Sequence, residues 1–163
     1  MNYYIYAPID GIIEKKIKNF KFNYARENIN KSIQIIILKE THSYANVKKL
    51  VEHIENSIKK INSIKIETGD IDYDEESLIC NIKLDNKLKK LIQLLHSNGK
   101  YFQNSNKPPY IPIINNRNNG IDEEDLSKLN KELRNKKFFI RQIGLYVNHH
   151  DYKEPEKIRD FTL

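Results

Sequence analysis

Strand-like and helix-like segments alternate along this chain, and this alternation limits its fold more than any other feature. Runs rich in apolar and β-branched residues predict strands over residues 2–9, 32–38, 110–114 and 138–147, and two alternating apolar arms predict a β-hairpin over 63–84. Apolar residues at helical spacing predict four helices, over residues 12–20, 47–61, 88–95 and 126–133. A strand followed by a helix occurs in each half, which permits two structurally similar lobes.

Polar residues mark the starts of three of these helices. Ser43, Asp85 and Asp122 each stand before a run at helical spacing, and their side chains can accept hydrogen bonds from the N–H groups of a helix start. We expect Ser43 to cap the helix over 47–61 and the two aspartates to cap the helices that follow them.

Length and composition restrict the class of protein. A chain of 163 residues fits one domain, so residues 1–163 are expected to form a single two-lobed unit. The 28 basic residues exceed the 22 acidic ones, and the net charge of +6 favours an anionic partner, although an AT-rich genome also produces a lysine-rich composition. The longest apolar run, Ile35–Leu38, cannot span a bilayer, and the N-terminus lacks a signal-peptide pattern. These features predict a cytoplasmic protein with no membrane partner.

The sequence predicts no metal site and no cofactor. A single cysteine, Cys80, excludes a disulfide framework and a multi-cysteine metal site, and we expect its thiol to be buried as a small apolar group. The adjacent His149 and His150 would point to opposite sides of an extended segment, and the other three histidines have no ligand at a recognised spacing. Nucleophile elbows, phosphate-binding Walker loops and dinucleotide glycine fingerprints are absent from the sequence.

An acidic stretch in the predicted hairpin resembles part of a calcium loop. Asp70, Asp72 and Asp74 match the first three ligand positions of an EF-hand. The match then fails, because Glu75 stands where that loop needs glycine and Asn81 stands where it needs glutamate. We therefore expect a solvated hairpin tip over residues 69–76.

Two polar junctions, each leading into an apolar strand, are the most informative feature. The first is Glu27–Ile33 (Glu-Asn-Ile-Asn-Lys-Ser-Ile) and the second is Pro108–Ile113 (Pro-Pro-Tyr-Ile-Pro-Ile). With the strand order, these junctions resemble the two-histidine phosphoesterases, which include RNA 2′-5′ ligases, cyclic phosphodiesterases and viral 2′-5′ oligonucleotide phosphodiesterases. In that family each half has a strand beginning His-x-Thr or His-x-Ser, the first often preceded by Glu-Asn and the second by Pro. The resemblance covers essentially the whole chain, including Phe139–Tyr146 and Phe161–Leu163. It implies an α+β protein of two lobes, each a small antiparallel sheet flanked by helices, with a central cleft between them.

The same resemblance implies that both catalytic imidazoles are replaced. Asn30 and Ser32 stand at the first motif pair, and Tyr110 and Pro112 stand at the second. The family chemistry needs one group that accepts a proton and one that donates it near neutral pH. Asparagine does not titrate, tyrosine has a reference pKa near 10, and proline offers no side-chain donor. This departure points to a degenerate member, or to a different register in which His42 or His149 enters the cleft.

The resemblance also implies a ligand cleft between the two motif strands. We expect hydrogen-bonding groups, positive charges and base-stacking rings there, while Lys31 is expected to face away because neighbours on a strand point in opposite directions. These candidate residues are Asn30, Ser32, Tyr110, Arg117, Lys107, Arg141, Tyr4, Tyr6 and Tyr146. The alternative interpretation is structural, with Asn30 and Tyr110 as ordinary residues before a strand and the other tyrosines packed in the sheet.

Three functions follow as hypotheses. The first is binding, and so sequestration, of a cyclic or 2′-5′-linked nucleotide or short oligonucleotide with catalysis lost or reduced, as a viral or phage antagonist of an immune signal would need. The second is an active phosphodiesterase with a rearranged acid and base, such as Tyr110 with a loop histidine. The third is a protein-interaction module. The oligomeric state does not follow from the sequence.

Overall fold

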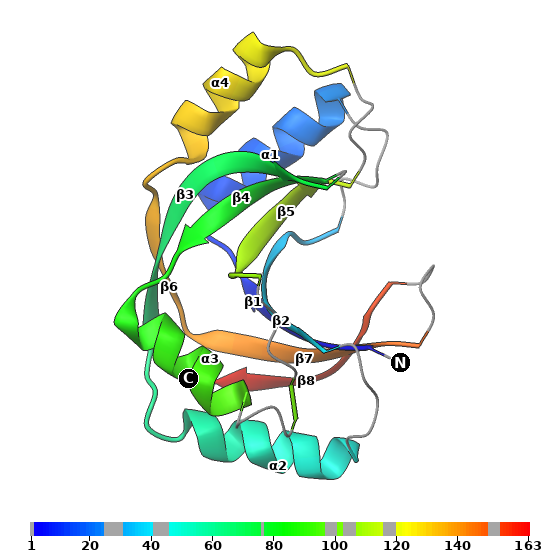
Figure 1. Ribbon diagram of the computed structural model, residues 1–163, viewed down its shortest axis with the longest axis vertical. Coiled ribbons are helices and arrows are strands. Elements are labelled where there is room, and N and C mark those ends of the chain that lie inside the picture. The colour runs from blue at the N-terminus through cyan, green and yellow to red at the C-terminus, as the bar shows by residue number, and fades with distance from the viewer. Residues whose placement is uncertain are drawn as a thin grey trace.

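One curled antiparallel sheet of eight strands organises the described part of the chain (Figure 1). The computed structural model describes residues 2–24, 31–40, 46–75, 77–96, 101–102, 107–115, 120–149 and 154–163. Across the sheet the strands follow the order β6-β3-β4-β5-β2-β1-β7-β8. They are β1 (Asn2–Pro8), β2 (Gln34–Glu40), β3 (Ile64–Asp74), β4 (Ser77–Lys83), β5 (Tyr110–Ile114), β6 (Lys137–Ile140), β7 (Gln142–Asn148) and β8 (Glu156–Thr162).

Helices lie on the outer side of this curled sheet in two pairs (Figure 1). Within the described residues they are α1 (Gly11–Tyr24), α2 (Val47–Ile58), α3 (Asn86–His96) and α4 (Glu123–Leu133). The helix α1 packs on α4 and α2 packs on α3. Each helix buries one apolar stripe, as the helical spacing predicts; in α2 the buried residues are Leu50, Ile54 and Ile58.

The two predicted lobes share this single sheet. One lobe holds β6, β3, β4 and β5 with α1 and α4, and the other holds β2, β1, β7 and β8 with α2 and α3. The lobes join where β2 pairs with β5, with Ile36 opposite Tyr110. The predicted two-lobed α+β fold is therefore confirmed, with its two small sheets continuous through this pair of strands.

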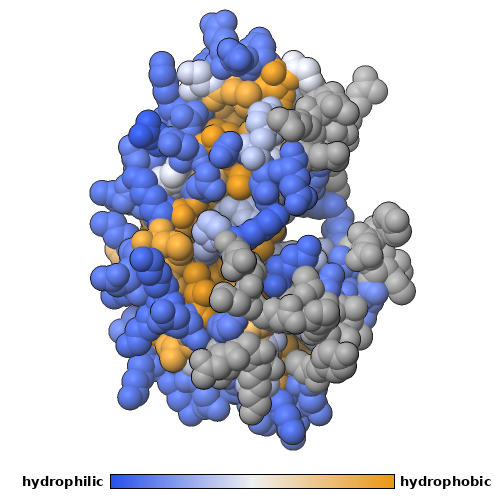
Figure 2. Space-filling model, viewed as in Figure 1, coloured by the Kyte–Doolittle hydropathy of each residue, from blue (hydrophilic) through white to orange (hydrophobic). Residues whose placement is uncertain are grey.

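Alternate residues of the central strands face the core and the inner surface of the sheet. On β1, Tyr3, Ile5 and Ala7 belong to the hydrophobic core, whereas Tyr4 and Tyr6 point the other way. Figure 2 shows hydrophilic side chains around the periphery of one face of the molecule, with apolar side chains in a band through its middle. The inner surface of the sheet is therefore where polar and aromatic groups from both lobes can gather.

The predicted hairpin tip over residues 69–76 was too long. β3 and β4 stay paired as far as Asp74 and Ser77, and the turn at Glu75 has a φ of 55°. The register shifts between Thr68 and Ile71, and beyond this bulge Ile71 continues the apolar alternation against the core. The sequence pattern was interrupted by the bulge and not by the end of the strand.

The last predicted strand, over 138–147, is in fact two strands of opposite lobes. β6 ends at Ile140 and pairs with β3, whereas β7 begins at Gln142 and pairs with β1 and β8. A further strand, β8, begins at Glu156, before the Phe161–Leu163 segment that the family resemblance includes. Because β8 is an edge strand with mostly exposed side chains, it lacks the apolar alternation that marks a buried strand.

Two of the three predicted helix caps are confirmed. Asp85 and Asp122 each accept a hydrogen bond from the backbone N–H three residues later, at 2.8 Å in both cases. The N-cap of α2 is Asn46, whose Oδ1 accepts from the Lys48 N–H at 3.0 Å, while Ser43 lies outside the described residues. No described helix has the length and apolar character needed to cross a membrane.

Candidate functional site

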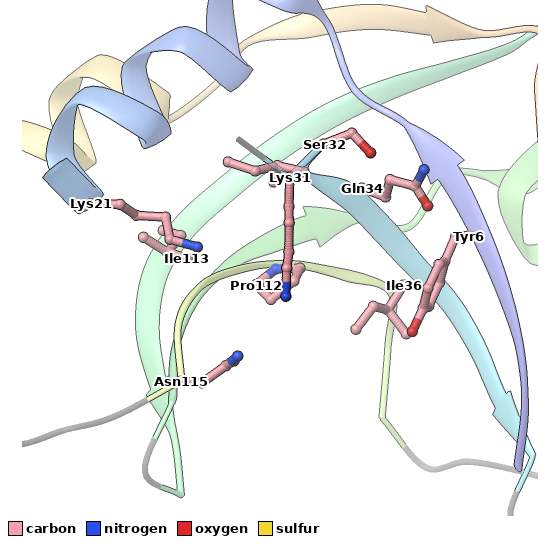
Figure 3. A pocket seen from close by; sticks show the side chains of 10 residues that line it. Tyr6, Lys21, Lys31, Ser32, Gln34, Ile36, Pro112, Ile113 and Asn115 are labelled. Atoms are coloured by element: carbon pink, nitrogen blue, oxygen red, sulfur yellow. The ribbon is translucent and has the colours of Figure 1, made fainter. Parts of the chain in front are cut away.

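A pocket of about 180 Å³ opens on the inner face of the sheet where the two lobes meet (Figure 3). Strands from opposite lobes, β2 and β5, form its floor, and β1 and α1 contribute from the sides. The described residues that line it are Tyr6, Lys21, Lys31, Ser32, Ile33, Gln34, Ile36, Pro112, Ile113 and Asn115.

The alternation of β2 directs Gln34 and Ile36 into this pocket, and Ile35 between them is buried. Ser32 and the buried Ile33 line the pocket from the residues that precede β2. The Ile33 N–H donates a hydrogen bond to Glu14 Oε2 at 3.1 Å, which ties the approach to β2 to helix α1. The side chains at the start of this strand are thus held in place by a helix of the other lobe.

Two lysines supply positive charge to the pocket. Lys21 extends from the last turn of α1, and Lys31 reaches over the pocket from the residues before β2 (Figure 3). The expectation that Lys31 would face away was wrong, because β2 begins only at Gln34 and strand alternation does not yet apply at Lys31. Lys31 also forms an exposed ion pair with Glu154. None of the described lining residues is a carboxylate.

Three tyrosines form a connected cluster beside the pocket. The ring centroids of Tyr6 and Tyr146 are 4.8 Å apart, and those of Tyr4 and Tyr6 are 5.4 Å apart. Gln34 Nε2 donates a hydrogen bond to the Tyr146 hydroxyl at 3.1 Å. These tyrosines were expected either to lie at the cleft or to pack within the sheet. In the structure they pack on one another along the inner face of the sheet, and Tyr6 also lines the pocket.

Gly144 makes room for the Tyr146 ring. A Cβ atom at this position would lie 2.7 Å from Tyr146 Cε2 and 3.1 Å from Asp160 Oδ1. Replacing Gly144 with alanine should push the ring off its place, break its bond to Gln34 and lower the free energy of unfolding by about 1–2 kcal/mol. Chemical denaturation measures this change.

Gly11→Ala is the matched control for this prediction, because a Cβ atom there would have no neighbour within 4 Å. This control should keep or slightly raise the denaturation midpoint, since alanine favours a helix more than glycine does. Equal midpoints for Gly144→Ala and the unchanged protein would contradict the close packing of Tyr146.

The structure brings some of the predicted site residues together and separates others. Ser32, Pro112 and Tyr6 line the pocket, Tyr146 joins it through Gln34, and Tyr4 lies along the same face. Tyr110 stands opposite Ile36 in the sheet. Lys107 forms an ion pair with Asp74 at 2.9 Å, and Arg141 lines a separate groove with Pro8–Asp10. Asn30 and Arg117 lie outside the described residues.

Gln34, Lys21 and Asn115 line the pocket but were not predicted. Gln34 carried a usable signal, because it is the one polar residue inside the otherwise apolar run that follows Ser32. Its partner Tyr146 is 112 residues away, so no local pattern indicates their contact. Lys21 and Asn115 reach the pocket only through the packing of α1 and the end of β5.

Comparisons with known proteins find this architecture among solved structures. No protein-family profile and no curated protein matches the sequence. LigT of E. coli complexed with NADP+ has a TM-score of 0.71 at 10% identity, with 99% of this chain and 97% of that chain covered. TT0787 of Thermus thermophilus has a TM-score of 0.72 at 8% identity, with 100% and 98% covered, and a protein described as a phosphoesterase has 0.70 at 8% identity, with 99% and 98% covered. This chain has the two-histidine phosphoesterase fold.

Histidines do not line the described pocket of this two-histidine phosphoesterase fold. His149 is exposed after β7, and His42 lies outside the described residues. His53 packs against Tyr101 with ring centroids 4.2 Å apart, and its Nε2 is 2.8 Å from the Leu95 carbonyl. Within the described part of the chain, no three His, Cys, Asp or Glu residues gather as metal ligands.

Tyr6 and Tyr110, at the centre of this phosphoesterase fold, stay protonated at neutral pH. Burial, reinforced by the neighbouring tyrosines, raises the pKa of Tyr6 well above its ordinary value. Burial also raises the pKa of Tyr110, and the Lys107 ammonium opposes this shift only in part. Both hydroxyls can therefore donate hydrogen bonds, but neither is tuned to exchange a proton near pH 7.

Proposed function

We propose that this protein binds a cyclic or 2′-5′-linked nucleotide or short oligonucleotide through a phosphate in the pocket, with turnover absent or much reduced. The main support for this proposal is the composition of the pocket. Lys21 and Lys31 supply positive charge, and Ser32 and Gln34 supply further hydrogen-bond donors. Charge-assisted hydrogen bonds of this kind hold a phosphate strongly. Binding without turnover would serve to sequester a cytoplasmic signalling nucleotide, as an antagonist of an immune signal does.

The pocket volume indicates which part of a ligand it takes. Sites that enclose a drug-sized molecule measure roughly 300–1,000 Å³, whereas this pocket measures about 180 Å³. It therefore suits a phosphate with part of its sugar. The bases would extend over the inner face, where Tyr6 and Tyr146 present aromatic rings.

Solved structures of the same fold support a nucleotide as the ligand. LigT of E. coli has been crystallised with NADP+, ATP, 3′-AMP and phosphate. These ligands share a phosphate group, which is the group that two lysines and a hydroxyl would recognise.

The protonation states of the pocket argue against efficient phosphodiester cleavage. Cleavage needs a base for the attacking oxygen and an acid for the leaving oxygen. No histidine, aspartate or glutamate is among the described lining residues, and the pKa of Tyr6 is raised further from neutrality. The pKa of Tyr110, the candidate acid of the enzyme hypothesis, is likewise raised away from neutrality.

The direct test is incubation of stoichiometric protein with 2′,3′-cyclic nucleotides, cyclic di- and trinucleotides and 2′-5′ oligoadenylates. Chromatography before and after heat denaturation should show a ligand that disappears on incubation and returns intact on heating. A product that accumulates with time would overturn binding without turnover. A panel in which every compound stays unretained would overturn the proposal and favour a protein-interaction module.

Replacing Lys31 with glutamine should lower the affinity for the retained ligand about tenfold or more, because one charge-assisted hydrogen bond contributes about 1.5–3 kcal/mol. Titration calorimetry measures the affinity. Lys90→Gln, which removes the same charge from the exposed side of α3, is the matched control and should leave the affinity unchanged. Equal losses in both variants would mean that net charge, and not the pocket, attracts the ligand.

A further inference from the structure

A β-bulge between β1 and β2 changes which side chain of β2 reaches the inner face. Tyr6 stands opposite Ile36, but the register shifts between Ile5 and Tyr6, so that Tyr4 stands opposite Lys39. A bulge inserts one extra residue in one strand and so redirects the side chains beyond it. Without the shift, Tyr4 would face Leu38, which is buried in the core.

A second bulge acts in the same way between β7 and β8. Gly144 stands opposite Asp160, and Leu145 opposite Arg159, but Tyr146 then stands opposite Lys157. The extra residue in β8 is Ile158, and it thus places Lys157, rather than Ile158 itself, beside the Tyr146 ring.

Together the bulges align four side chains across β2, β1, β7 and β8. This lysine–tyrosine row consists of Lys39, Tyr4, Tyr146 and Lys157, each opposite the next in the sheet. Lys39 Nζ lies 5.7 Å from the Tyr4 ring centroid, and Lys157 Nζ lies 5.7 Å from the Tyr146 ring centroid. Both ammonium groups therefore lie on the inner face with the rings.

Lys157 is held in this row by groups that an anion could displace. Its Nζ lies 3.1 Å from Asp160 Oδ2, and hydrogen bonds to Asp160 and Tyr146 raise its pKa, so the ammonium stays charged. The Lys157–Asp160 pair is exposed, and an exposed ion pair is weak. A phosphate can compete with this carboxylate for the ammonium.

The row continues from the pocket, since Tyr146 accepts the hydrogen bond of the pocket residue Gln34. We propose that the lysine–tyrosine row is a second phosphate-binding subsite, and that the ligand is therefore an oligonucleotide with at least two phosphate groups rather than a mononucleotide. This inference rests on the proposed function, which places the first phosphate in the pocket.

The dimensions of the sheet fit such a ligand. From Gln34 to Lys39 the strand rises roughly 17 Å at about 3.3 Å per residue, and the row itself crosses four strands, or roughly 14 Å at about 4.8 Å per spacing. A single phosphate therefore cannot contact Gln34 in the pocket and Lys39 at the far end of the row together. A chain of nucleotides can, with a base between phosphates lying on the tyrosine rings.

The test compares adenylates that differ only in length. Linear 2′-5′-linked adenylates with one, two and three phosphates, and cyclic di- and triadenylate, are titrated calorimetrically between about 50 and about 200 mM salt. Each further phosphate contact should steepen the plot of log Kd against log salt by about 0.7, which is about a threefold greater loss of affinity over that range. Lys39→Gln and Lys157→Gln should each remove about one such contact for the longer ligands and none for 2′-AMP.

Asp160→Asn supplies the opposite change, because it removes the carboxylate that competes for Lys157, and it should tighten the trimer but leave 2′-AMP unaffected. Lys90→Gln should change neither. A salt dependence that does not grow with length, or a growth that persists in Lys39→Gln and Lys157→Gln, would overturn the second subsite while the pocket stands. Failure of every adenylate to bind would overturn the proposed function and this inference together.

Discussion

Replacing Thr68 with valine should lower the free energy of unfolding by about 2–4 kcal/mol, because it leaves two backbone groups without a partner. Thr68 is fully buried at the point where α4 ends against β3. Its hydroxyl donates to the Leu133 carbonyl and accepts from the Lys136 N–H at 2.8 Å. Valine fills the same space but carries no hydroxyl, so both bonds are lost. Urea denaturation followed by circular dichroism measures the change.

Thr68→Ser separates the hydroxyl from the packing. Serine keeps both hydrogen bonds and loses one methyl group, so it should cost only about 1 kcal/mol. The backbone of Thr68 also binds this turn, donating to the Lys136 carbonyl at 2.9 Å and accepting from the Asn135 N–H at 3.0 Å, and neither variant removes those bonds. Equal stability of the valine and serine variants would show that the hydroxyl does not fix the end of α4.

Stability should also fall steeply as the pH rises above about 9. Burial raises the pKa of the Cys80 thiol from 9.0 to about 12. Between these values the unfolded chain releases a proton that the folded protein keeps, so the free energy of unfolding falls by about 1.4 kcal/mol per pH unit. Below pH 9 the thiol is protonated in both states, and its contribution is fully present. The raised pKa values of Tyr6 and Tyr110 add a further loss above about pH 10.

The Cys80→Ala variant shows how much of this alkaline loss in the free energy of unfolding comes from the thiol. The variant lacks the titrating group, so between about pH 9 and about pH 10 its stability should fall by about 1 kcal/mol less than that of the unchanged protein. Denaturation midpoints at half-unit steps of pH provide the comparison. Parallel curves would show that the thiol does not control the alkaline loss.

Local patterns predicted the elements with strong periodicity. The helix over 47–61 has one apolar stripe, and α2 buries that stripe from Leu50 to Ile58. The strand over 110–114 was predicted with the bounds that β5 has. The first part of β8, before Phe161, was missed for a physical reason, because an edge strand buries few side chains and leaves little apolar pattern.

The candidate site was predictable only where a strand pattern or the family resemblance reached it. Ser32 and Pro112, which stand at motif positions of the resemblance, line the pocket. Lys31 was misjudged, since strand alternation was applied to a residue that precedes the strand. Arg141 was expected near the cleft, but it stands between two strands of opposite lobes and lines another groove.

Most of the order of strands and helices, and the inward alternation of Gln34 and Ile36 on β2, can be read from the amino-acid sequence because they depend on residues close together in the chain. The sheet register depends on the folded structure. The two bulges that place Lys39 beside Tyr4 and Lys157 beside Tyr146 arise from the way one strand pairs with another. The contact of Gln34 with Tyr146 likewise needs Gly144 to leave room for the ring. Such pairings join distant segments, so no local pattern of residues records them.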